Sequence, residues 1–128
     1  MTAEPLLAPT SIGDLIDRIT ILEIKAKRIG APDKAANVAR ELSSLSLLRD
    51  AAGLDTPEIA GFVDELHRIN TILWDIEEEI RALDRTSDFG PRFIELARGV
   101  YTWNDRRSAV KREINRISGS AFSEEKSY

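Results

Sequence analysis

Residues 11–29, SIGDLIDRITILEIKAKRI, constrain the fold more than any other stretch, because they are too apolar for an ordinary surface helix and too charged to cross a membrane. Apolar side chains recur there in steps of three and four, which predicts a helix with a buried stripe. The stripe consists of Ile12, Leu15, Ile16, Ile19, Leu22, Ala26 and Ile29. At about 100° per residue, Ile21 and Ile24 point to the opposite side of the helix. We therefore expect this helix to have neighbours on two sides.

Three further segments repeat apolar residues at helical spacing: residues 33–52, 57–85 and 91–117. The links between successive segments are short, which favours antiparallel neighbours. At 1.5 Å per residue the last two helices would be about 40 Å long and the first two about 27 to 31 Å. We therefore expect an all-α, four-helix antiparallel bundle-like domain over residues 11–118, in which two shorter helices pack on a long helical hairpin. Residues 1–10 are predicted to be a flexible N-terminal lead, and residues 119–128 a docked C-terminal tail.

The composition excludes some classes of function. The chain has 128 residues, enough for one domain with a sizeable core. It has no cysteine, which excludes thiolate chemistry and cysteine-ligated zinc. No segment approaches the 18 uncharged apolar residues of a membrane span. A net charge of -4 argues against a dedicated nucleic-acid binder. We expect a cytoplasmic protein without membrane insertion.

Polar residues on three of the predicted helices incline toward the interior of the bundle: Glu23, Asn70, Glu77, Asn104 and Arg107. Two interpretations stay open. In the first, they form a ligand pocket, with Arg107 binding an anion and Glu23 or Glu77 acting as a base or hydrogen-bond acceptor. In the second, they form a buried network of ion pairs and amides that fixes the register and the oligomeric state.

The stretch from Asp75 to Glu79 concentrates carboxylates, at spacings that could place two ligands on a divalent ion. No second acidic motif supplies further ligands, so we interpret it as a solvated acidic face. Residues 57–85 are mostly acidic where charged and residues 91–117 mostly basic, which predicts ion pairs between these two helices. No glycine-rich phosphate loop, nucleophile elbow or zinc-protease motif is present. We predict no catalytic residue, no metal and no cofactor.

Two aromatic residues lie off the apolar stripes, Trp74 on the third helix and Tyr101 on the fourth. Together with Ile21 and Ile24 they are candidate interface residues. The longer hairpin would also extend beyond the shorter helices, and a second copy of the chain could cover what is left exposed. These features predict a homodimer or a protein partner.

Four motifs taken together, SIGDLIDRITILEIK, LWDIEEEIR, FIELARGVYTWNDRRSAVKREIN and the terminal EEKSY, resemble those of a family of small, uncharacterised bacterial helical proteins, a domain of unknown function. The chain departs from the family pattern at residues 89–91, where an acidic helix start is expected. The resemblance implies a neighbourhood of glycosyltransferase and surface-polysaccharide genes, and a terminal segment, including Lys126 and Tyr128, that docks on the bundle or on a partner. It also singles out the following positions: Asp17, Thr20, Glu23, Lys25, Trp74, Glu77, Arg81, Arg98, Tyr101, Asn104, Asp105, Arg107, Glu125, Lys126, Ser127 and Tyr128.

The sequence thus leaves two functions open. The first is a non-enzymatic helical interaction or accessory protein, linked to cell-surface polysaccharide biosynthesis. The alternative is a ligand-binding or catalytic bundle with a polar core site for an anionic metabolite such as a sugar nucleotide.

Overall fold

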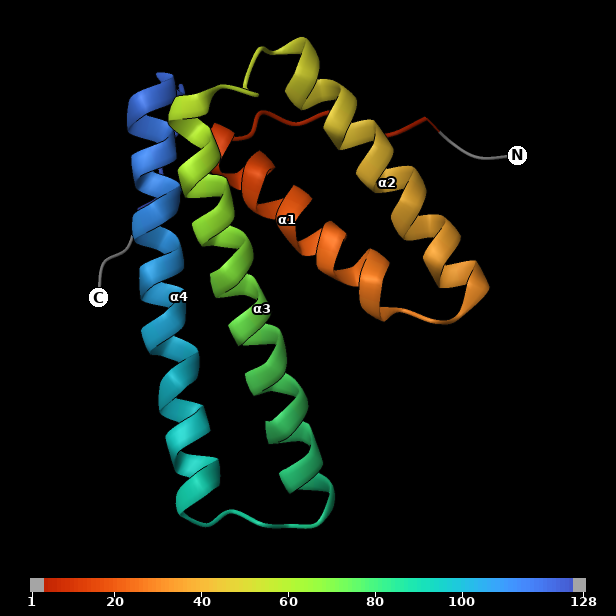
Figure 1. Cartoon of the computed structure of the whole chain (residues 1–128), viewed down its shortest axis with the longest axis vertical. Helices are drawn as coiled ribbons and strands as arrows, with labels where there is room; N and C mark the ends of the chain where they lie inside the picture. The colour runs from red at the N-terminus through yellow and green to blue at the C-terminus, as the bar shows by residue number, and fades with distance from the viewer. Residues whose placement is uncertain (1–3, 126–128) are drawn as a thin grey trace.

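The computed structural model describes residues 4–125, which form four helices and no strand. These are α1 (Ile12–Arg28), α2 (Pro32–Ala51), α3 (Pro57–Arg85) and α4 (Pro91–Ser118). In Figure 1, α3 and α4 form a long antiparallel hairpin, α1 lies against one half of it, and α2 lies outside α1. The predicted all-α, bundle-like fold is confirmed. Of the two shorter helices, α1 packs on the long hairpin and the backbone of α2 packs on α1.

The helix ends follow from local chemistry. The Ser11 hydroxyl accepts a hydrogen bond from the backbone N–H of Asp14 at 3.0 Å and caps α1. Proline occupies the first turn of α2, α3 and α4, where no hydrogen-bonding partner for its nitrogen is needed. Gly90 precedes Pro91, so α4 begins without an acidic cap at the point where the chain departs from the family pattern. Gly119, with φ of 69°, ends α4 in the left-handed conformation.

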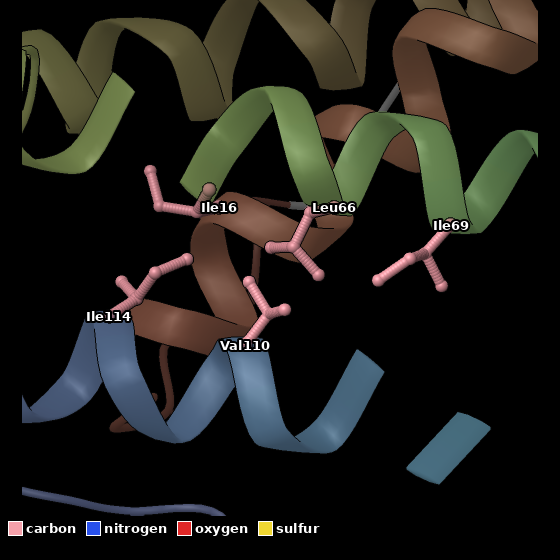
Figure 2. Close-up of a cluster of buried hydrophobic side chains, with 5 residues drawn as sticks. All are labelled: Ile16, Leu66, Ile69, Val110 and Ile114. Carbon is pink, nitrogen blue, oxygen red and sulfur yellow. The ribbon is translucent and has the colours of Figure 1, made fainter. Parts of the chain in front are cut away.

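The helix α1 is buried on two sides, and both sides are formed by residues of its main apolar stripe. On one side Ile16 enters a cluster with Leu66 and Ile69 of α3 and with Val110 and Ile114 of α4, which Figure 2 shows converging from the three helices. On the other side a second cluster joins α1 to α2 and the start of α3; its buried members are Leu15, Ile19, Leu54 and Ile59, with Leu42 and Leu45 packed against them. The backbone of α2 approaches α1 and no other helix. The short helix α1 therefore holds the domain together.

The start of α1 packs very closely on α4. The Gly13 N–H donates to Oδ1 of Asn115 at 2.7 Å, and a Cβ atom on Gly13 would lie 2.7 Å from the carbonyl oxygen of Lys111. Glycine is needed here because any side chain would push the two backbones apart. One turn further along α1, and one turn back along α4, this contact brings Asp17 beside Arg107.

No helix in residues 4–125 is long and apolar enough to cross a membrane.

Candidate functional site

A buried carboxylate, Asp17 of α1, lies at the centre of the polar interior. Its residue is only 4% exposed. Nε of Arg107 donates to both carboxylate oxygens, at 2.9 and 3.1 Å, and Nη2 of Arg107 donates to Oδ2. Such a two-pronged pair between guanidinium and carboxylate is among the strongest charge-assisted contacts in proteins. The hydrogen bond and the charge of Asp17 outweigh partial burial and raise the pKa of Arg107, which therefore stays protonated.

Three neutral side chains complete this arrangement. Asn70 of α3 donates through Nδ2 to Oδ1 of Asp17 and to the hydroxyl of Thr20, both at 2.8 Å. The Thr20 hydroxyl donates to the backbone oxygen of Asp17 at 2.7 Å. Oδ1 of Asn104 accepts from Nη1 of Arg107 at 3.3 Å. We call these five residues the Asp17 network. Its main donors and acceptors are paired with one another across α1, α3 and α4.

Glu23, the carboxylate that the sequence interpretation placed in the interior, does not belong to this network. It is half-buried, and it makes no hydrogen bond or ion pair with any residue from 4 to 125. Figure 1 shows that α2 and α3 diverge on either side of the C-terminal half of α1, which is the half that carries Glu23. Asp17 takes the expected role because its position, one residue past Ile16, turns it toward α4. Periodicity alone missed Asp17 and Thr20, but the family resemblance included both.

An open groove of about 660 Å³ lies beside the Asp17 network, and we call it the α1–α3 groove. Its apolar walls come from α1 and α3: Ile21, Ile24, Leu73 and Trp74. Its polar lining consists of Asn70, Glu77, Glu78, Arg81, Asn104 and Arg107. Four of the five predicted ligand-binding residues and three of the predicted interface residues therefore line one groove, whereas Glu23 does not.

The candidate interface residues differ in their surroundings. Ile24 is buried within the chain, so only its edge reaches the groove. Ile21 and Trp74 are half-buried, and Nε1 of Trp74 donates to Glu78 at 2.7 Å. Tyr101 is exposed and lines a different hollow of about 380 Å³ on α4. Lys126 and Tyr128 lie outside the described residues, so their predicted docking stays a prediction.

The first part of the C-terminal tail contacts the start of α1 and the side of α4. The Ser120 hydroxyl accepts from the Ile12 N–H at 3.0 Å. The nearly buried Lys111 ammonium bridges Asp14 at 2.8 Å and Glu124 at 3.0 Å. Burial lowers the pKa of Lys111, but the bonds to the two carboxylates outweigh it and the pKa is raised. Burial likewise raises the pKa of Asp14, but Lys111 lowers it further, below its usual value.

Carboxylates in the acidic stretch of α3 form ion pairs with different arginines. Asp75 pairs with Arg28 at 2.5 Å, and Glu79 pairs with Arg92 of α4 at 2.6 Å. Within residues 4–125, no three acidic or histidine side chains gather as a metal site would require. The pairs between α3 and α4 follow the opposite charges that the sequence shows on these helices.

Taken together, the chain is an all-helical domain with an apolar groove beside a self-paired polar network. Residues 8–128 match the Family of unknown function (DUF6165), and the chain belongs to this family. No curated protein and no solved structure matches it.

Proposed function

We propose that this chain is a non-enzymatic helical interaction protein that binds a protein segment in the α1–α3 groove. One observation carries the proposal. Both oxygens of the Asp17 carboxylate accept from Arg107, and each nitrogen of the Arg107 guanidinium donates to Asp17 or Asn104. The groove therefore offers a ligand mainly the apolar surfaces of Ile21, Leu73 and Trp74. An apolar groove with one aromatic wall is suited to peptide side chains.

The same observation disfavours the alternative, a pocket for an anionic metabolite. An anion bound by Arg107 would have to compete with a carboxylate that is already held by several bonds and is almost fully buried. Glu77 and Glu78 add negative charge to the same groove. Because Arg81 and Arg107 balance these two charges, the groove lining carries no net positive charge that would attract a sugar nucleotide.

A thermal-shift screen of nucleotides, sugar nucleotides and divalent ions, combined with a capture experiment, tests the proposal. We expect no concentration-dependent shift from any of these small molecules. In the capture experiment the chain is the bait in an extract of its source organism, and we expect it to retain a partner protein. The Ile21→Glu variant should lose this partner. The control variant Leu47→Glu should keep it, since Leu47 is exposed on α2 away from the groove. A metabolite shift that Arg107→Met abolishes in a folded protein would refute the proposal.

The link to surface-polysaccharide biosynthesis and the homodimer both stay proposals. The identity of a captured partner tests the first. The second is taken up below.

A further inference from the structure

The N-terminal lead carries two apolar side chains that pack against no part of the described fold. The described part of the N-terminal lead, residues 4–10, is extended and reads EPLLAPT. Leu6 is 99% exposed and Leu7 is 94% exposed, the two most exposed large apolar residues that the structure describes. Exposing two adjacent leucine side chains to water costs free energy, and burying them against another surface would recover it.

Two prolines preorganise the lead for binding in an extended conformation. Pro5 and Pro9 flank the two leucines, and each proline fixes its own φ and biases the preceding residue toward extended backbone. An extended, proline-bounded segment loses little conformational entropy when it docks, and proline-rich segments typically dock in grooves with aromatic walls. Trp74 supplies such a wall in the α1–α3 groove.

The lead does not fit the groove of its own chain. In Figure 1 it runs from the start of α1 toward the side where α2 lies, whereas the groove is lined by α1, α3 and α4. Ile21 lies about 14 Å along α1 from Ile12. The four residue-to-residue steps from Leu7 to Ser11, fully extended, span at most about 14 Å. The lead would have to reverse its direction, stretch completely and cross to the other face of α1.

We infer that the α1–α3 groove receives the N-terminal lead of a second copy of this chain, with Leu6 and Leu7 against Ile21 and Trp74. The inference rests on the proposed function and names the occupant of the same groove. Reciprocal exchange of the two leads closes a symmetric dimer.

The charges fit this placement. Glu4 is the only charged residue of the described lead, and Arg81 is one of the two basic residues that line the groove. Glu4 is about 10 Å from Leu7 along an extended chain. Arg81 is likewise about 10 Å from Trp74 along α3. With the leucines on the apolar wall, Glu4 therefore reaches Arg81, whose own pairing with Glu77 is long, at 3.8 Å, and exposed.

Sedimentation analysis of the full chain over a range of concentrations tests the inference. We expect a dimer whose dissociation constant rises about 100-fold or more in the variant with Leu6→Ser and Leu7→Ser. The control with Leu47→Ser and Leu48→Ser removes two exposed leucines from α2 and should leave the dimer unchanged. A fluorescent peptide EPLLAPT should bind the lead variant, and it should bind more weakly, by about threefold to fivefold, when Arg81→Glu is added.

A charge swap makes the test specific. Glu4→Arg and Arg81→Glu should each weaken the dimer by about threefold to fivefold, and the two together should restore it. A chain that is monomeric at every concentration overturns the inference. A dimer that resists the lead substitutions but is broken by Ile21→Glu overturns the lead as occupant and leaves the proposed function standing. If neither changes the dimer and no partner depends on Ile21, both fail.

Discussion

The pair formed by Asp17 and Arg107 gives the sharpest test of whether the polar interior is structural. Asp17→Asn keeps the shape of the side chain but removes its charge. The amide oxygen can still accept from Arg107 but the new N–H₂ cannot, so the guanidinium loses one acceptor and its charged partner while its side chain is only 27% exposed. Removing one partner of a fully buried pair costs about 3 to 5 kcal/mol. Because water reaches part of Arg107, we expect a loss of about 2 to 3 kcal/mol in the free energy of unfolding.

The double variant with Asp17→Asn and Arg107→Met measures how strongly the two residues stabilise each other. Methionine keeps much of the apolar stem of Arg107 and leaves no unpaired charge. We therefore expect the double variant to lose about 1 to 2 kcal/mol less than the sum of the two single variants. Glu113→Gln is the control, because Glu113 pairs with Arg116 on the surface of α4, and we expect it to cost far less than Asp17→Asn.

Urea denaturation followed by circular dichroism measures all four free energies. The structural interpretation is refuted if Asp17→Asn costs no more than Glu113→Gln. It is also refuted if the two single losses simply add, since the pair would then not be coupled.

Three further predictions follow from other parts of the fold. Gly13→Ala should lower the free energy of unfolding by about 1 to 3 kcal/mol, because its Cβ meets the Lys111 carbonyl. Gly61→Ala, in an open position of α3, should raise it by about 0.5 to 1 kcal/mol, and equal effects in the two denaturation curves would contradict the close packing of α1. The Lys111 bridge should contribute to stability between about pH 4 and 10, since the pKa of Asp14 is lowered and that of Lys111 raised. Its share is lost as the pH falls through the lowered pKa or rises through the raised one, so the difference between Lys111→Met and the parent chain in urea should shrink at pH 3. Glu23→Gln should change stability by less than about 0.5 kcal/mol and leave the dimer intact, whereas a larger loss would restore Glu23 to the polar interior.

The fold could be predicted well because its signals are local and periodic. The stripes of α1, α3 and α4 and the prolines at the helix starts each fix an element or a boundary. The burial of Ile24 outside the main stripe could also be predicted, whereas Ile21 is only half-buried and lines the groove.

The polar interior could be predicted only in part. Asn70, Asn104 and Arg107 belong to α3 and α4, which pack on each other more extensively than any other two helices. Their positions relative to the apolar stripes therefore decided where they point. Whether Asp17 or Glu23 is buried depends on how α1 crosses the hairpin of α3 and α4 and on where α2 departs from α1. A helical wheel contains no information on how α1 crosses the hairpin or where α2 departs from α1. Helical periodicity therefore placed Glu23 in the interior in place of Asp17.

The most direct test of protein docking in the groove is a photo-crosslinking experiment. A photoreactive amino acid replaces Ile21, and a control chain carries it at Leu47 on the exposed face of α2. Equal amounts of isotopically labelled and unlabelled chain are mixed and irradiated, and mass spectrometry locates the joined peptides. We expect position 21 to join two different chains through residues 4–10 and position 47 to give no such product. No adduct at position 21, or adducts of equal yield at both positions, would contradict the assignment of the groove as a docking surface.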